Sequence, residues 1–302
     1  MSVDKWLEIS IRVPSEDADL VAEYLSPLSR GGAVVEQEVL SDEEEGDILG
    51  RNDHATVKLY HPLDQDHEEI TSLVAAKMEE ILPKGGFSLG QQEIQEEEWS
   101  TAWRAWFKPL KIGPLLVTPP WTKKNRHDGL IPVIVDPGMA FGTGSHPTTR
   151  LCLRGLIKRL HPGDRILDAG TGSGILAIAA AKLGASYVLA FDVDDVAVDN
   201  ARSNIEANGV ANLVNVRHCT IDDIGPRMAG SFDLVVVNIS SRIVALMAEA
   251  LKAQLKERGT LIVSGISSTN LGLVEDSLKN AGMADLKINR QGDWRSITCT
   301  RD

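Results

Sequence analysis

The sequence predicts an α/β protein of two domains, in which a doubly wound, Rossmann-like sheet with an antiparallel edge hairpin follows a smaller α+β domain. Three observations predict this. The chain of 302 residues is long enough for two cores. Strand patterns alternate with helix patterns through its second part. One of those strands runs directly into a glycine-rich turn that opens a helix. We expect an N-terminal domain at 1–95, a helical linker at 96–109 and the larger domain at 110–302.

The first domain has the predicted order β-α-β-β-α-β, which is typical of a ferredoxin-like fold. Apolar and polar residues alternate from Trp6 to Val13, as in a half-buried strand. A helix then begins near Ser15, which can cap it, with acidic residues in the first turn. The remaining elements are expected as strands at 33–39 and 55–60, a helix at 66–82 and a strand at 87–95.

The linker carries Trp99, Trp103 and Trp106 at a spacing that places all three on one helical face. This stripe either docks the two domains or forms an aromatic wall over a cofactor or substrate. Beyond it, strands and helices alternate up to a closing hairpin. The strands are expected at 165–169, 187–191, 213–218, 232–237, 260–264, 285–290 and 294–300, and the helices at 174–183, 195–208, 243–256 and 271–280.

Composition narrows the class of protein. The chain is 43% hydrophobic and 25% charged, which is ordinary for a soluble protein. No apolar run reaches the roughly 18 residues of a membrane helix, and the N-terminus lacks the pattern of a signal peptide. The cysteines Cys152, Cys219 and Cys299 are far apart. We therefore expect a cytoplasmic monomer with no metal site and no membrane contact.

Charge is distributed unevenly along the chain. Residues 1–100 contain 24 Asp and Glu against 7 Lys and Arg, a net charge of −17, whereas residues 101–302 carry +5. An acidic first third does not favour direct nucleic-acid binding, because phosphate contacts need Lys and Arg. It would attract a basic partner. Simple solubilisation is the alternative, and the acidic run 41–47 is expected to be a solvated loop.

The most specific motif is the stretch Asp136-Pro-Gly-Met-Ala-Phe-Gly-Thr-Gly-Ser-His-Pro-Thr-Thr149. Its glycines and prolines argue against a helix or strand, and its glycines let the backbone approach a ligand closely. Phe141 offers a flat apolar face. Thr143, His146 and Thr149 offer short hydrogen-bonding groups.

A second motif, Asp168-Ala-Gly-Thr-Gly-Ser-Gly174, ends a strand and opens a helix. Exposed amides and the helix dipole there favour an anionic ligand group, and Asp168 suits an ammonium. Asp192 ends the next strand, where a carboxylate can accept both hydrogen bonds of a ribose diol. The run Gly172–Ala177 also satisfies the dinucleotide pattern, so NAD is an alternative ligand, and a purely structural turn is another.

A third motif is Asn238 at the end of the apolar strand Asp233–Val237. Such sheets bind ligands at the carboxyl ends of their strands, and an Asn amide can both donate and accept hydrogen bonds to an incoming amine. A turn-forming Asn at a strand end is the alternative.

With these motifs the chain resembles the ribosomal protein L11 methyltransferase family (PrmA type) over nearly its whole length. The resemblance also rests on Trp99 to Trp103, Lys108-Pro109, Trp121 and the tail 294–297. It implies a class I S-adenosylmethionine-dependent methyltransferase fold with the cofactor around Thr149, Gly170, Asp192 and Asn238. It further implies methylation of the N-terminal α-amine and of lysines on a basic ribosomal stalk-base protein, recognised by a mobile N-terminal domain.

Two departures from the family pattern bear on the site. The family commonly has Asn-Ile-Leu-Ala where this chain has Asn238-Ile-Ser-Ser241, and Cys where Thr171 stands. Ser240 and Ser241 make the amine side of the pocket more polar. A methyltransferase for lysines of another protein, or for a small amine, is therefore an alternative, as are an NAD-dependent oxidoreductase and a non-catalytic cofactor sensor.

The resulting site hypothesis needs no metal, because the sulfonium methyl group is already activated. Asn238 and the Ile239 carbonyl orient the amine, while Phe141, Thr143 and His146 close the pocket. His146 either acts as a general base or braces the loop. The residues expected to bind cofactor are Phe141, Thr149, Asp168, Gly170, Gly172, Gly174, Asp192 and Asn238, and those expected at the reacting amine are Thr143, His146, Asn238 and Ile239.

Overall fold

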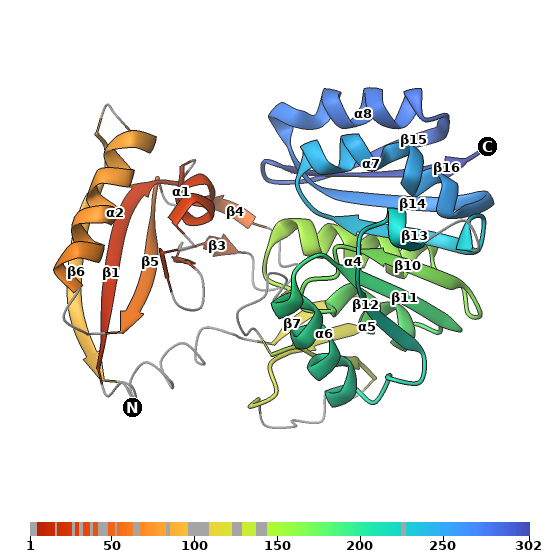
Figure 1. The fold of residues 1–302 in the computed structure, drawn as a ribbon, viewed down its shortest axis with the longest axis horizontal. Coiled ribbons are helices and arrows are strands. Elements are labelled where there is room, and N and C mark those ends of the chain that lie inside the picture. Colours follow the sequence, from red (N-terminus) through yellow and green to blue (C-terminus); the bar gives the residue numbers. More distant parts are fainter. Residues whose placement is uncertain are drawn as a thin grey trace. The chain divides into compact units, whose positions relative to one another are not determined.

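The protein divides into two compact units, Met1–Trp106 and Phe107–Asp302 (Figure 1). The computed structural model describes residues 5–15, 17–25, 28–29, 33–36, 39–41, 48–51, 53–62, 67–82, 85–95, 109–122, 129–136, 144–224 and 228–302. The predicted helical linker and its tryptophans lie outside the described residues. The domain boundaries at 95 and 110 therefore stay predictions.

The N-terminal unit is an antiparallel sheet in the order β2-β5-β1-β6. Its core lies between one face of the sheet and two helices, because Leu7, Ile9, Ile11 and Val13 alternate along β1 and pack with residues of α1 and α2. The elements are β1 (Lys5–Pro14), α1 (Ala18–Leu25), β2 (Val34–Glu36), β5 (His54–Pro62), α2 (His67–Ile81) and β6 (Ser88–Gln95).

One difference from prediction lies between β2 and β5. The strand expected at 33–39 ends at Glu36, and a separate antiparallel hairpin follows, with β3 at Val39–Ser41 and β4 at Ile48–Arg51. Residues 42–47, most of the predicted acidic loop, lie outside the described residues. The assignment of this unit to the ferredoxin-like class stays a prediction.

The second unit is built on a seven-stranded sheet in the order β12-β11-β10-β13-β14-β16-β15. The first five strands in this order are parallel, whereas β16 runs antiparallel to both β14 and β15. The predicted doubly wound sheet with an antiparallel edge hairpin is therefore confirmed. Its strands are β10 (Arg165–Ala169), β11 (Tyr187–Asp192), β12 (Val214–His218), β13 (Phe232–Asn238), β14 (Leu255–Ser267), β15 (Met283–Gln291) and β16 (Trp294–Arg301).

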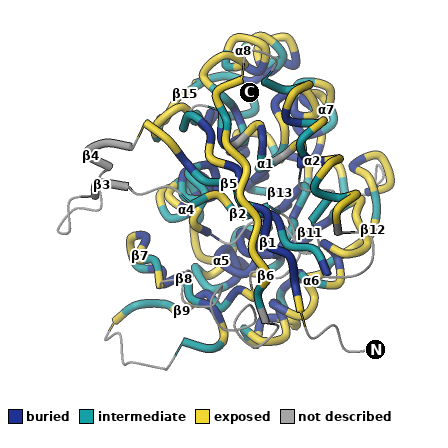
Figure 2. Tube along the Cα trace, turned by 90° about the vertical axis from the view of Figure 1, so that its left-hand side faces the viewer, coloured by how far each residue is buried: buried dark blue, intermediate teal, exposed yellow. Residues whose placement is uncertain are grey.

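Helices cover both faces of this sheet. One core contains residues of α4, α5 and α6, and the other contains residues of α7 and α8. Alternate residues of the central strands enter opposite cores, so these strands are buried on both sides. Most of their residues are buried, which Figure 2 draws in dark blue. The helices are α4 (Pro147–Arg159), α5 (Ile175–Lys182), α6 (Asp195–Ala207), α7 (Ser241–Gln254) and α8 (Leu271–Asn280), with 3-10 turns at Asp222–Ile224 and Ser268–Asn270.

Two features of this unit were not predicted. A small sheet of β7 (Leu110–Ile112), β8 (Leu115–Thr118) and β9 (Ile131–Ile134) packs against the α5 side. The expectation that the motif 136–149 contains no helix is wrong for its last three residues, because α4 begins at Pro147. Proline is well suited to a first helical position, since its missing N–H has no intrahelical partner there.

Candidate active site

The described parts of the predicted motifs meet at the carboxyl edge of the seven-stranded sheet. Strand β10 lies between β11 and β13, so the chain connections leave it in opposite directions, and a crevice forms at such a switch point. The turn after β10 contains three glycines with positive φ, at 72° for Gly170, 53° for Gly172 and 81° for Gly174. L-residues rarely adopt this conformation, which explains the repeated glycine.

Asp168 is fully buried beneath this turn, and only one of its two oxygens has a partner. Its Oδ2 accepts hydrogen bonds from the Thr171 hydroxyl at 2.7 Å and from the Ala177 amide of α5 at 3.1 Å. Its Oδ1 has no partner among the described residues. Burial raises the pKa of Asp168 from 3.8 to about 7, although the two hydrogen bonds act in the opposite direction.

The backbone amides of the glycine turn are largely used within the protein. Gly170 and Thr171 both donate to the Phe191 carbonyl, at 2.9 and 3.0 Å, and Gly174 donates to the Thr171 carbonyl at 2.9 Å. The expectation of exposed amides is therefore wrong at these positions. The sequence could not show this, because the acceptors come from β11 and from the turn itself.

Asp192 ends β11 and is held by three backbone amides. Its Oδ2 accepts from Gly172 at 2.9 Å, and its Oδ1 accepts from Val193 at 2.8 Å and Asp194 at 3.2 Å. A carboxylate offers about four acceptor directions, so one remains on Oδ2. Asp192, the residue predicted to bind a ribose, thus lies at the predicted edge of the sheet, and its carboxylate is held in a fixed orientation.

Asn238 and Thr149 lie together, as the resemblance implies. The Asn238 Nδ2 donates to the hydroxyl of the fully buried Thr149 at 3.4 Å, a long hydrogen bond, and the Asn238 Oδ1 is buried without a partner among the described residues. Unsatisfied buried oxygens are rare in native proteins and call for a ligand, a water or an ion.

His146 caps helix α4. Its Nδ1 accepts from the Thr148 amide at 3.3 Å and lies 2.7 Å from the Thr148 hydroxyl, while its ring packs edge-on against Trp294. These contacts are those of a bracing residue, which is the second of the two predicted roles. Its role at the reacting amine stays a prediction, as do those of Phe141 and Thr143, which lie outside the described residues.

Ile239 fits between two glycines. A Cβ added to Gly170 would overlap the Ile239 side chain, and a Cβ added to Gly265 would overlap the Ile239 carbonyl group. Gly265 also has a positive φ of 81°. Gly265 was not predicted from the sequence, although its place near the end of β14, at the same edge of the sheet, is a signal that could have indicated it.

The two unusual serines differ in environment. Ser241 is buried, and its hydroxyl donates to the Gly265 carbonyl at 3.1 Å. Ser240 is exposed at the N-cap of α7, where its side chain makes no capping hydrogen bond. Ser241 therefore holds Gly265 in place beside Ile239, in the slot that Gly170 and Gly265 form around that residue. Ser240 is the serine that can make the site more polar.

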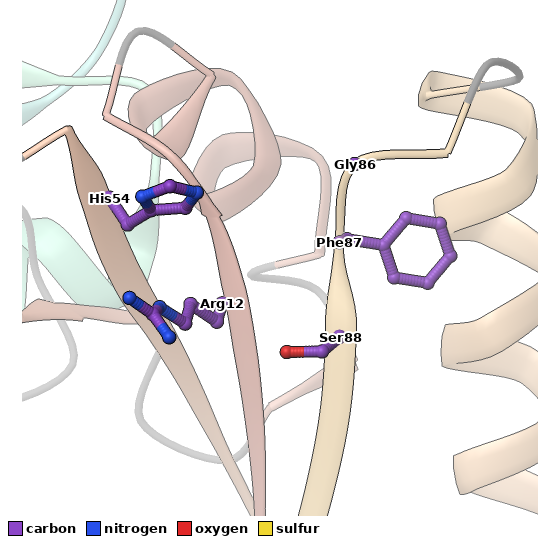
Figure 3. A pocket seen from close by; sticks show the side chains of 5 residues that line it. All are labelled: Arg12, His54, Gly86, Phe87 and Ser88. Carbon is purple, nitrogen blue, oxygen red and sulfur yellow. The ribbon is translucent and has the colours of Figure 1, made fainter.

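A separate hollow of about 220 Å³ lies on the N-terminal unit. Arg12, His54 and Ser88 lie around it, while Phe87 points to the opposite face of the sheet, toward α2 (Figure 3). Its glycines of positive φ, Gly85 and Gly86, lead from helix α2 into strand β6, whereas those at β10 lead from a strand into a helix, so the hollow does not resemble the site at β10. Within the described residues, no group of three or more His, Cys, Asp or Glu is arranged to hold a metal, and no helix there is long and apolar enough to cross a membrane.

Comparison with known proteins agrees with this geometry. The family model described as "Ribosomal protein L11 methyltransferase (PrmA)" matches residues 5–302. Proteins named ribosomal protein L11 methyltransferase are 37% identical in Pelotomaculum thermopropionicum, over 97% of this chain and 98% of that protein, and 35% identical in Listeria innocua, over 98% and 99%. The solved structure of a ribosomal protein L11 methylase from Lactobacillus delbrueckii subsp. bulgaricus superposes with a TM-score of 0.60 at 32% identity, covering 65% of this chain and all of that one.

Proposed function

Since this chain belongs to the ribosomal protein L11 methyltransferase family and is an S-adenosylmethionine-dependent methyltransferase, we propose which amines it methylates. They are the N-terminal α-amine and the lysine side chains of ribosomal protein L11. The names of its relatives support this substrate. The observation that carries the proposal is the buried Oδ1 of Asn238 at the end of β13, which has no partner among the residues that the structure describes.

The residues at the sheet edge fit the cofactor. Asp168 has a buried oxygen without a partner, suited to an ammonium, and Asp192 keeps an acceptor direction for a ribose hydroxyl. Gly170, in the turn between these two carboxylates, has no side chain, and the Ile239 side chain packs directly against it. When bound, S-adenosylmethionine supplies an activated methyl group on a sulfonium. We assign Asp168, Gly170, Gly172, Gly174, Asp192, Thr149, Asn238 and Phe141 to its binding.

The protein's part in the reaction is to align a neutral amine. The Asn238 side chain is oriented by the hydrogen bond that its Nδ2 donates to the Thr149 hydroxyl. Its Oδ1 is then left to accept a hydrogen bond from the substrate amine. An α-amine of pKa ~7.8 is about one-third neutral at pH ~7.5, whereas a lysine of pKa ~10.4 is only about 0.1% neutral. An α-amine thus needs alignment, and a lysine also needs desolvation to lower its pKa. We also assign the Ile239 carbonyl, Thr143 and His146 to this side of the pocket.

The acidic N-terminal region is the proposed recognition domain. Its net charge of −17 over residues 1–100 favours a basic protein over a nucleic acid. We place its boundary at residue 95, follow it with a helical linker at 96–109, and assign the methyltransferase domain to 110–302. The proposal also describes a cytoplasmic monomer that binds neither nucleic acid nor membrane directly.

Mass spectrometry of recombinant ribosomal protein L11, incubated with this chain and S-adenosylmethionine, tests the proposal. We expect gains of about 14 Da per methyl group, mapped by fragmentation to the N-terminal amine and to lysines. No gain, with cofactor binding intact by calorimetry, would contradict the substrate. It would favour a different protein or a small amine as acceptor, the alternative that the exposed Ser240 supports.

A further inference from the structure

Helix α6 holds strand β9 through two asparagine side chains. Asn208 bonds both backbone groups of Ile134, accepting from its amide at 2.9 Å and donating to its carbonyl at 2.5 Å. Asn204, one turn earlier, accepts from the Asp136 amide at 2.9 Å. Asn208 is the C-cap of α6, and Asp136 lies two residues beyond the end of β9. Four helical residues rise about 6 Å and two extended residues about 6.6 Å, so the i,i+4 pair at the end of α6 matches the i,i+2 pair Ile134 and Asp136.

Asn204 also reaches the glycine turn, whereas Asn208 does not. The Asn204 Nδ2 donates to the Ser173 carbonyl at 2.9 Å and lies 2.8 Å from Asn200 Oδ1. The second donor bond of Asn208 goes to the Asn204 carbonyl within α6. The turn packs on the same helix, because a Cβ added to Gly174 would lie 3.2 Å from the Cα and Cβ of Ala201.

Asn204 is thus a nearly fully buried amide, 2% exposed, that joins two parts of the site. Its oxygen holds Asp136, the first residue of the Asp136–Thr149 motif, and its nitrogen holds the turn that follows Asp168. An Asn side chain has one acceptor oxygen and two donor hydrogens, and in Asn204 the oxygen accepts one hydrogen bond and the nitrogen donates two. No other standard side chain of this size both donates and accepts with this geometry.

We propose that Asn204 is a positioning residue for the cofactor, which sets the glycine turn and the start of the Asp136–Thr149 motif in one fixed relation. It acts through the Ser173 carbonyl and the Asp136 amide, without touching the cofactor itself. Its neighbour Asn208, the C-cap of the same helix, bonds Ile134 of β9 and the Asn204 carbonyl. Among the described residues it makes no hydrogen bond to the glycine turn, and it is therefore a matched control. The proposal concerns cofactor affinity and is independent of which amine is methylated.

The test is the affinity of S-adenosylhomocysteine, measured by calorimetry on the full chain, set against the Tm of each variant. We expect Asn204→Ala to weaken binding about tenfold and Asn208→Ala to weaken it less than about threefold. The fall in Tm should be similar in the two variants. Asn204→Asp keeps the acceptor for Asp136 but loses the donor to Ser173. We expect it to bind as weakly as Asn204→Ala, and it carries the test if the alanine variant does not fold.

Two results would overturn the proposal. Equal loss of affinity in Asn204→Ala and Asn208→Ala at equal Tm would show that only the stability of α6 matters. Wild-type affinity in Asn204→Asp would show that the bond to Ser173 does not position the turn.

Discussion

In the N-terminal unit the buried carboxylate of Glu8 has partners at both oxygens, whereas in the catalytic unit the buried carboxylate of Asp168 has partners at only one among the described residues. Glu8 Oε1 accepts from Gln92 at 3.0 Å and lies 3.4 Å from the Lys58 ammonium, and Oε2 accepts from Tyr60 at 3.1 Å. Burial, followed by the Glu8 charge, raises the pKa of Tyr60 well above its usual value.

The difference separates a structural network from a ligand site. A buried charge whose hydrogen bonds are all made stabilises one arrangement of its neighbours. A buried polar group that keeps an acceptor without a hydrogen bond has lost its hydration, and nothing compensates that loss until a ligand or water binds. By this criterion the Glu8 network holds the N-terminal sheet together, while Asp168 and Asn238 mark the place where a ligand binds.

The largest predicted effect is that of Gly265→Ala at the catalytic edge. The added Cβ would overlap the Ile239 carbonyl group, and the φ of 81° is strained for alanine. We expect a loss of about 2–4 kcal/mol in the free energy of unfolding and about a 100-fold fall in methyl transfer. Both are measured by denaturant unfolding and a methyl-transfer assay.

Gly272→Ala is the matched control for that change. Gly272 lies in α8 with nothing within 4 Å of an added Cβ and no positive φ, so alanine there should be neutral or stabilising by about 0.5–1 kcal/mol. Similar losses in the two variants would show that the slot around Ile239 is not the cause.

Glu8→Ala should damage the first unit and spare the site. Removal of one partner from a buried ionic network costs about 3 kcal/mol, because the remaining groups lose their counter-charge. We expect that loss in denaturant unfolding, with the affinity for S-adenosylhomocysteine changed less than about twofold. Glu93→Ala, which breaks the exposed pair with Lys5, should cost less than about 1 kcal/mol. A large fall in cofactor affinity in Glu8→Ala would contradict the division between the two networks.

These expectations depend on features that the sequence showed to different degrees. Strand β10 was predicted with its bounds, because the apolar run 165–169 and the glycines after it are local signals. Gly265 and Asn204 were missed, because their roles depend on Ile239 and Ser173, which are distant in sequence. Helix α4 was not predicted, because Ser145 and Pro147 are also typical of a loop. The signal that marks its start is His146, whose side chain caps the helix by accepting from the Thr148 amide.

The pH dependence of stability sharpens the comparison from the Asp168 side. Its pKa is raised from 3.8 to about 7, so between about pH 4 and 7 the folded protein binds a proton that the unfolded chain releases. Stability therefore falls as pH rises through this window and levels off above about pH 7.

Asp168→Asn removes this titration and isolates its effect. We expect the wild type, without cofactor, to lose about 2–3 kcal/mol more than the variant between pH 5 and pH 8 in urea unfolding. Parallel pH profiles for the two proteins would show that Asp168 is ionised throughout, and that its unpartnered oxygen has no such cost.

The smallest predicted effect concerns the charge of the N-terminal region. Its net charge of −17 should speed the encounter with a basic substrate, and salt screens that attraction. We expect the KM for ribosomal protein L11 to rise several-fold from 50 to 500 mM salt at roughly constant kcat. A KM that stays flat over this range would leave the acidic region with a solubilising role only.

The most direct test of the account is the rate of methyl transfer to ribosomal protein L11 by the wild type and by Asn238→Ala, at saturating S-adenosylmethionine. The account predicts an active wild type and a variant about 10- to 100-fold slower, because the amine loses its oriented acceptor while the cofactor remains bound. Equal rates in the two proteins would contradict it, since the unpartnered oxygen of Asn238 would then have no part in orienting the amine.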